Sequence, residues 1–234
     1  PTGLPVLLQR SFNKESERTA VLQSDYVHPF SEEGKWEAGY RGSLRNIDND
    51  YLVEEFADDT WQTLPNLSND FNYTEQVHAL YTNIGNKSGK LSYQAGLRFE
   101  YSDILTELLQ TGEKNQRDYA NLFPSLFLTW EQSEANSIQM SYSRRIRRPR
   151  FWDLNPFFTF SDSRNIRSGN PNLNPEFTDS YELSFIKYWE TTTFTSSLYY
   201  RDTKGNISNV RSLEQQGEDL VTISRPENFG RENS

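Results

Sequence analysis

The chain has 234 residues, of which 34% are hydrophobic and 14% aromatic, and its formal net charge is −9. A mean hydropathy of −0.83 is low for a conventional globular core, whereas the abundant aromatic side chains argue against a fully disordered chain. The acidic charge disfavours nucleic-acid binding, the absence of cysteine excludes disulfides and thiolate metal sites, and no apolar run is long enough for a transmembrane helix.

Stretches in which apolar and polar residues alternate follow one another along the chain, and this period is typical of strands whose faces meet different media. In chain order, they occupy residues 36–44, 71–81, 91–101, 122–130, 138–142, 181–189 and 194–200. In Leu91–Tyr101 every odd residue is apolar, so we expect the odd set to face lipid and even residues to face inward. The expected inward-facing residues include Arg98, Glu100, Gln139 and Glu182.

The connections between these stretches alternate in length. Short ones are expected at 29–34, 83–90, 131–136 and 190–192, and long ones at 46–69, 104–118, 148–177 and 204–218. Outer-membrane barrels combine short periplasmic turns with long extracellular loops, and they place aromatic girdles at the membrane interfaces. The aromatic residues expected near strand ends are Tyr26, Trp36, Tyr101, Trp130, Trp189 and Tyr200.

The pattern therefore predicts an all-β fold, an antiparallel up-and-down transmembrane β-barrel segment of about nine or ten strands. The alternative is a soluble antiparallel sheet whose aromatic side chains face a core. Residues 148–177 would form a long extracellular loop. Two Asn-Pro steps, 170–171 and 174–175, close that loop. Since proline restricts its own backbone and that of the preceding residue, we expect a rigid, extended re-entry that sets the register of the next strand.

The sequence GNPNLNPEFTDSYELSF, residues 169–185, resembles the GNPxLxPExSxxYELG signature of TonB-dependent outer-membrane receptors. The matching positions, expected to be structural, are Gly169, Asn170, Pro171, Leu173, Pro175, Glu176, Tyr181, Glu182 and Leu183. The segments SYSRRIRRPRFWDLNPF (141–157), YANLFPSLFLTW (119–130) and WEAGYRGSLRNIDNDY (36–51) are similar to barrel segments of the Bacteroidetes-type receptors of this kind.

The resemblance implies a piece of a barrel of about 22 strands that is plugged by an N-terminal domain. Such receptors bind scarce ligands outside a Gram-negative bacterium and import them with energy from the inner-membrane TonB complex. We expect residues 1–234 to be a partial barrel domain of the outer membrane, with the plug domain, the TonB box and the C-terminal strands outside it. The implied partners are outer-membrane lipid, the plug domain, TonB and an unknown small ligand or glycan.

The dense basic run in the predicted loop is a candidate anion site, because arginine pairs bidentately with carboxylates and phosphates. The candidate ligand-binding residues are Arg144, Arg145, Arg147, Arg148, Arg150 and Trp152. The alternative is internal pairing with acidic residues such as Asp153, Asp162 and Glu176. Similarly, Trp152, Phe157, Phe158 and Phe160 could stack on a ring-bearing ligand, or they could anchor the loop on itself.

Other chemistry is not expected. The acidic residues between Asp48 and Asp59 lack the spacing of a calcium loop, and His28 and His78 alone do not make a zinc or haem site. No catalytic or nucleotide-binding motif is present, so we expect no enzyme activity, no metal site and no cofactor. Two other functions stay open at this point: a soluble carbohydrate-binding or hydrolytic module, and an outer-membrane adhesin or anchor without TonB coupling.

Overall fold

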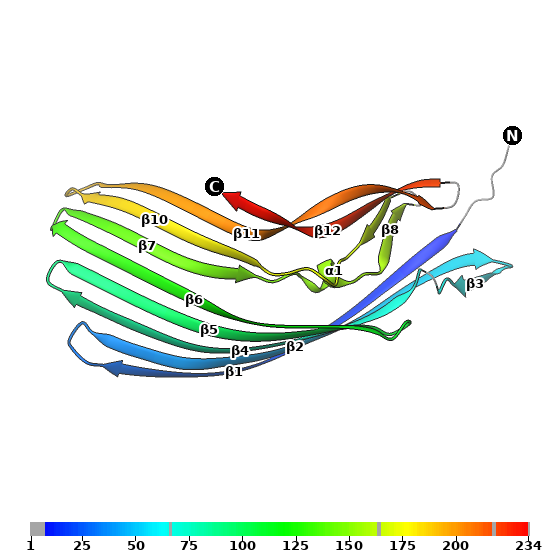
Figure 1. Cartoon of the computed structure of the whole chain (residues 1–234), viewed down its shortest axis with the longest axis horizontal. Coiled ribbons are helices and arrows are strands. Elements are labelled where there is room, and N and C mark those ends of the chain that lie inside the picture. The colour runs from blue at the N-terminus through cyan, green and yellow to red at the C-terminus, as the bar shows by residue number, and fades with distance from the viewer. Residues whose placement is uncertain (1–7, 66, 163–164, 217–218, 234) are drawn as a thin grey trace.

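The computed structural model describes residues 8–65, 67–162, 165–216 and 219–233, which form one large, curved and mostly antiparallel sheet (Figure 1). The long strands, in sheet order, are β1 (Gln9–Pro29), β2 (Lys35–Ala57), β4 (Asn69–Ser88), β5 (Leu91–Leu108), β6 (Glu113–Ser133), β7 (Asn136–Arg147), β10 (Glu176–Tyr188), β11 (Thr193–Gln216) and β12 (Asp219–Asn233). The short elements are β3 (Thr60–Thr63), α1 (Phe151–Leu154), β8 (Phe158–Asp162) and β9 (Asn165–Ser168).

The predicted fold class is confirmed. Each long strand pairs antiparallel with the next one along the chain, so the sheet has the up-and-down order of an outer-membrane barrel. The sheet curves but does not close on itself (Figure 1), which agrees with a segment of a larger barrel. Among the described residues, no helix has the length and apolar character needed to span a membrane.

The connections differ at the two ends of the sheet. Short turns join β1 to β2, β4 to β5, β6 to β7 and β10 to β11 at one end, on the left of Figure 1. At the other end, the chain forms β3 after β2 and before β4, and β3 pairs with β2. The longest connection, residues 148–175, carries α1, β8 and β9 between β7 and β10. The predicted long connections are therefore present between β2 and β4 and between β7 and β10, whereas the connection between β5 and β6 at the same end is only the turn 109–112.

Some predicted loops are wrong because they are strands. The expected loop 104–118 is mostly paired strand, with only residues 109–112 in the turn between β5 and β6. Likewise, β11 continues through most of 204–218, β2 continues to Ala57, and β4 continues to Ser88. These extensions are polar on at least one face, so their composition resembles that of loops although their backbones are fully paired.

A belt of exposed apolar side chains runs across the outer face of the sheet, near the end with the short turns. Exposed fractions reach 69% for Leu22 and 72% for Leu198. The belt includes Leu22, Tyr26, Trp36, Leu44, Leu80, Ile84, Leu91, Leu97, Phe99, Tyr101, Leu122, Leu126, Trp130, Met140, Tyr181, Leu183, Phe185, Phe194, Leu198 and Tyr200. A continuous apolar surface of this extent is the contact face for lipid rather than for water. The expected outward direction of the odd residues in Leu91–Tyr101 is thus correct.

The aromatic residues mark the edges of this belt, but two of them do not lie near strand ends as expected. Tyr101 and Tyr200 lie within β5 and β11, which continue well past the belt. Tyr200 belongs to a cross-strand row with Tyr142 and Tyr181, whose neighbouring ring centroids are 5.0 and 6.2 Å apart. The row lies where the outer face changes from apolar to polar.

Beyond the belt, the apolar face of the strands changes side. On β4, Leu80 and Ile84 point outward within the belt, whereas Phe71 and Tyr73 are buried on the inner face further along the strand. Periodicity alone assigned residues 71–81 to a single apolar face. The reason for the reversal is that the strand leaves the lipid there and meets a protein core on its inner face instead.

Candidate ligand-binding site

The connection between β7 and β10 folds against the inner face of the sheet. Phe151 and Leu154 of α1 are 5% and 3% exposed, and Leu173 is 2% exposed. They pack in one core with inner-face residues of β2, β4 and β5, namely Ile47, Phe71, Tyr73 and Ile104. Burial of these apolar side chains fixes the connection at the long-loop end of the sheet.

Arg148, the first residue after β7, ties this connection to the wall. Its guanidinium Nη2 donates to Glu100 Oε2 at 2.5 Å and to Ser102 Oγ at 2.9 Å, and its Nε lies 3.6 Å from Glu75 Oε1. Burial lowers the pKa of Arg148, but the bond to Glu100 and the nearby Tyr119 and Glu75 outweigh it and leave that pKa raised. The residue therefore stays charged.

The Gly-Asn-Pro segment is held by its backbone. Gly169 N–H donates to Asn155 O at 2.8 Å, and a Cβ at Gly169 would lie 2.4 Å from that same oxygen. Asn170 N–H donates to Asp153 O at 2.6 Å, and its side-chain amide donates to Pro226 O of β12 at 3.2 Å. The segment thus joins α1 to β12.

The first Asn-Pro step forms a turn, not the extended re-entry that we expected. Leu173 N–H donates to Asn170 O at 3.3 Å, and Asn172 N–H donates to Asn170 Oδ1 at 3.0 Å. Asparagine at the first position and Pro171 at the second are the usual residues of such a turn. The turn swings Leu173 into the core, so its conformation follows from burial of one side chain.

The second Asn-Pro step leads directly into β10. The Asn174 N–H donates to Asn228 Oδ1 at 2.8 Å, and Pro175 is followed by Glu176, the first residue of the strand. The Glu176 carboxylate accepts hydrogen bonds from the Arg147 guanidinium and from Ile207 N–H of β11. Further along β10, Tyr181 and Leu183 belong to the outer belt and Glu182 lies on the opposite face.

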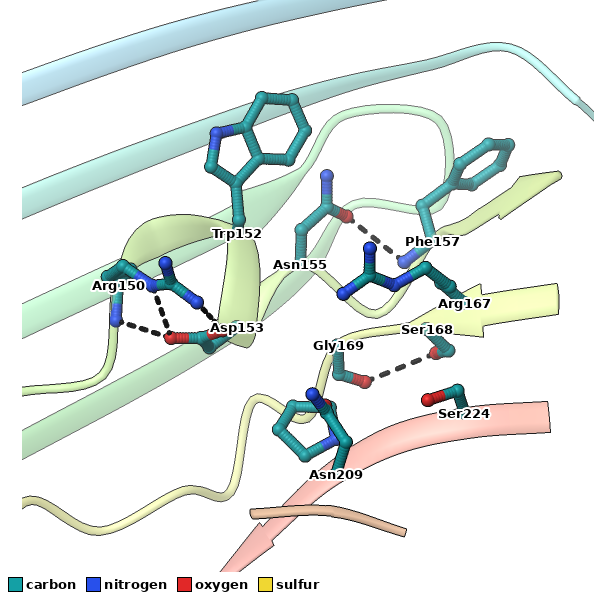
Figure 2. A pocket seen from close by; sticks show the side chains of 11 residues that line it. Arg150, Trp152, Asp153, Asn155, Phe157, Arg167, Ser168, Gly169, Asn209 and Ser224 are labelled. Carbon is teal, nitrogen blue, oxygen red and sulfur yellow. Dashed lines mark hydrogen bonds and ion pairs between the residues drawn. The ribbon is translucent and has the colours of Figure 1, made fainter. Parts of the chain in front are cut away.

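A cavity of 290 Å³, which we call the mouth cavity, opens between this connection and strands β11 and β12. Arg150 and Arg167 approach it from opposite sides, and Trp152, which is 40% exposed, stands beside them (Figure 2). Arg150 donates to Asp153 at 3.1 Å, and this bond raises the pKa of the guanidinium. The rest of the lining is mostly polar: Asn155, Phe157, Ser168, Gly169, Asn209, Ser224 and Pro226.

The predicted arginine cluster does not form one site. Arg147 and Arg150 pair with Glu176 and Asp153, two of the acidic partners considered from the sequence, while the third, Asp162, has a side chain outside the described set. Arg148 turns into the wall. Arg144 lies 3.9 Å from Asp179, and Arg145 points into a separate hollow on the inner wall. Only Arg150 and Trp152 of the predicted set line the mouth cavity.

Sequence reasoning missed the residues that position this cavity: Phe151 and Leu154, the buried Asn155, and Arg167. The i, i+3 apolar pair between Pro149 and Pro156 was the available signal for a short anchoring helix. Asn155 joins the loop to β4, because Asn69 donates to its side chain at 3.3 Å. Arg167 carried no sequence signal, since only the pairing of β9 with β12 brings it to the cavity.

The other expectations lie elsewhere. Phe157 lines the cavity, whereas the side chains of Phe158 and Phe160 fall outside the described set. The residues expected inside, Arg98 and Glu100, form an ion pair on the inner face at 2.5 Å. No cluster of three or more His, Cys, Asp or Glu residues suited to a metal ion occurs among the described residues.

The model of the outer membrane protein beta-barrel family matches residues 3–234. The chain belongs to this family. It is therefore a protein of the bacterial outer membrane as predicted, which excludes the alternative of a soluble β module. The matching region covers all described strands, so the lipid belt and the inner-face core are both parts of the family's barrel.

Solved structures agree on the fold. The ferric citrate transporter FecA in its unliganded form has a TM-score of 0.60 and 14% identity, covering 84% of this chain and 29% of that one. The copper transporter OprC has a TM-score of 0.65 and 11% identity, with coverages of 92% and 34%. The FrpB iron transporter from Neisseria meningitidis has a TM-score of 0.60 and 15% identity, with coverages of 94% and 33%.

This chain spans about a third of the length of those transporters, and at such identities the likeness shows the fold alone. The predicted resemblance to the barrel of TonB-dependent receptors is confirmed at that level. No curated protein sequence matches this chain.

Proposed function

We propose that this chain is part of an outer-membrane TonB-dependent receptor, which captures a scarce ligand outside the cell and passes it through a plugged barrel. The main support is the connection 148–175, which the core around Phe151 and Leu154 holds over the inner face. A receptor needs such a preorganised surface at the entrance, because ordering a loose loop on binding reduces the affinity. On this proposal the chain performs no chemistry of its own.

The ligand in this proposal is a small anion, such as a carboxylate-bearing metal chelate. The mouth cavity has two arginines against one carboxylate in its lining, and Trp152 offers an exposed ring beside them. Arginine binds carboxylates through charge-assisted hydrogen bonds, and planar ligand groups can stack on indole. The name of one of the three transporters above concerns ferric citrate, a metal chelate that bears carboxylates, and the names of the other two concern copper and iron.

Two measurements on the full-length protein test this proposal. In cell fractions, a heat-modifiable band in the outer membrane that crosslinks to TonB is expected. The same band without any TonB crosslink would point to an uncoupled adhesin or anchor and overturn the proposal. For capture, ferric citrate serves as the anionic probe, and Arg167→Gln should weaken its binding to the purified receptor about tenfold. Unchanged affinity would remove the mouth cavity from the proposal.

A further inference from the structure

A hollow of 460 Å³ lies on the outer face of the sheet, over strands β1, β2, β4 and β5, and we call it the outer hollow. Its lining is Ser24, Tyr26, Ala38, Gly39, Tyr40, Leu80, Tyr81, Thr82, Leu97 and Phe99. Leu80, Leu97 and Phe99 are exposed members of the apolar belt. The outer hollow is therefore a depression in the surface that meets lipid, and no part of the barrel interior can reach it.

The register explains the depression. One row across the four strands reads Tyr26, Ala38, Thr82 and Leu97, so that two short side chains stand between two long ones. Such a dip has room for a hydrocarbon chain. Lipid tails are as apolar as the belt itself, so a chain prefers the dip through packing, because its carbons gain van der Waals contacts there that a flat wall does not offer.

Polar groups begin where the outer hollow ends, toward the end of the sheet with the long connections. His78 precedes Leu80 by two positions on β4, so it shares the outer face, and it directly opposes Tyr101 of β5. Its Nδ1 lies 2.7 Å from the Tyr40 hydroxyl. Gly42 makes room for this contact, since a Cβ there would lie 2.5 Å from the same hydroxyl oxygen.

His78 and Tyr101 have donors to spare. The His78 side chain is exposed, and its second ring nitrogen, Nε2, has no hydrogen-bond partner in the described part of the chain. When the Tyr40 hydroxyl donates to Nδ1, Nε2 carries the hydrogen and can donate outward. The hydroxyl of Tyr101, a residue that is 40% exposed, stands beside it. Together they fit a lipid phosphate at the mouth of the hollow.

Two carboxylates come one step further from the belt. Asp103 of β5 directly opposes Asp118 of β6, and like charges in that position destabilise a sheet. Asp103 accepts a hydrogen bond from Gln116 at 3.1 Å, and neither acid has an ion-pair partner among the residues that the structure describes. Asp103 follows Tyr101 by two residues, roughly 7 Å along the strand. A cationic group just beyond the phosphate would therefore relieve the repulsion.

We propose that the outer hollow binds one molecule of phosphatidylethanolamine from the outer membrane. One acyl chain fills the hollow, His78 and Tyr101 donate to the phosphate, and Asp103 and Asp118 bind the ammonium. An anionic head group is disfavoured, because it brings no cation to the two carboxylates. The site is continuous with the lipid belt of the family's barrel, so this inference depends neither on the mouth cavity nor on ligand import.

The head group is tested on the full-length protein, purified in a mild detergent, with native mass spectrometry to count bound lipid. Phosphatidylethanolamine and phosphatidylglycerol with identical chains are the two probes. We expect one tightly held phosphatidylethanolamine, with an affinity about tenfold above that of phosphatidylglycerol. Asp118→Asn should narrow this difference, because it removes a partner of the ammonium. His78→Leu should weaken the binding of both lipids, since both carry the phosphate.

The acyl-chain site is tested by filling it. Ala38→Phe should weaken phosphatidylethanolamine binding about tenfold, because the added ring occupies the dip. Ala95→Phe is the matched control: Ala95 opposes the belt residue Leu126 on the same face but does not line the outer hollow. A heat-modifiable band from both variants would show that both barrels have folded.

Three results would overturn the inference. Equal lipid retention by Ala38→Phe and Ala95→Phe would mean that the belt holds only exchangeable lipid. Equal affinity of the wild-type protein for the two probes would contradict the assigned head group. Retention of lipopolysaccharide in place of phosphatidylethanolamine would give the hollow a different occupant. Ligand capture is measured separately, with ferric citrate, so the proposed function and this lipid site can fail independently.

Discussion

At the scale of single residues, Gly169 shows why the loop signature needs glycine. Its Cα approaches the α1 end so closely that a Cβ would meet Asn155 O at 2.4 Å and Asn155 N at 2.8 Å. Both atoms belong to the backbone, and the Gly169 N–H bond to Asn155 O depends on this approach. A side chain could be accommodated only if the loop moved away from α1.

Gly169→Ala should therefore destabilise the connection by roughly 1–3 kcal/mol, the usual cost of overpacking. Limited proteolysis of the full-length protein should show faster cleavage within 148–175. Gly230→Ala is the control, because a Cβ there meets nothing within 4 Å. Equal cleavage rates for the two variants would mean that the loop tolerates the added methyl group.

Arg148 offers a second test at this scale. Its side chain is 21% exposed and lies between Glu100, Glu75 and Ser102. Arg148→Met would remove the partner of Glu75 and leave Glu100 with Arg98 alone, and breaking such a buried pair costs about 3 kcal/mol or more. The exposed pair of Arg150 and Asp153 is worth about 1 kcal/mol or less, so Arg150→Met is the comparison in urea unfolding. A similar loss in both variants would contradict the buried role of Arg148.

At the scale of elements, the start of β10 should respond to pH. Burial raises the pKa of Glu176, but the hydrogen bonds from Arg147 and from Ile207 N–H outweigh it and hold that pKa below its usual value. A lowered pKa in the folded state stabilises the loop above the unfolded value, about 4.3 for glutamate. This stabilisation is lost as the pH falls through the folded pKa.

Proteolysis within 148–175 should accordingly accelerate as the pH is lowered below about 4.3, with a protease that is active in acid. The Glu176→Gln protein should be cleaved faster at neutral pH. Its cleavage rate should also depend less on acid, because an amide side chain carries no charge that acid could remove. A wild-type pH profile matched by that of the Gln variant would assign the acid sensitivity to other groups.

The strands and α1 also show how much of the fold could be predicted from the sequence. Alternation identified the lipid-facing residues of β5, because lipid and the barrel interior select opposite residue types along Leu91–Tyr101. It failed for the continuation to Leu108, where Ile104 turns inward to a core supplied by α1. That core depends on contacts between residues far apart in the chain, which no local period records. The mouth cavity has the same origin, since Arg167 reaches it only through the pairing of β9 with β12.

At the scale of the whole molecule, the two faces of the sheet belong to different solvents. Outward-facing side chains of the belt are apolar and exposed, while the inner wall at the same level carries arginines, hydroxyls and amides. An isolated sheet of this kind would leave the belt in water and two strand edges unpaired, at β1 and at the far end of the sheet. Insertion into a bilayer would cover the belt, and pairing with further strands of a larger barrel would cover the edges.

A charge placed on either face of one strand should distinguish the two solvents. Leu97 is 46% exposed in the middle of the belt, so Leu97→Arg should cost about 2–4 kcal/mol, as arginine does on the lipid face near the bilayer midplane. Gln94→Arg is the matched control, because Gln94 lies three positions earlier in β5 on the inner face. Urea unfolding of the full-length protein in lipid vesicles gives both values. If the two substitutions cost the same, the belt would not be the lipid contact, and the inner and outer faces would have to be reassigned. A cost for Leu97→Arg that disappears in detergent micelles would assign it to the lipid rather than to packing within the sheet, since micelles adapt around a charged side chain more readily than a bilayer does.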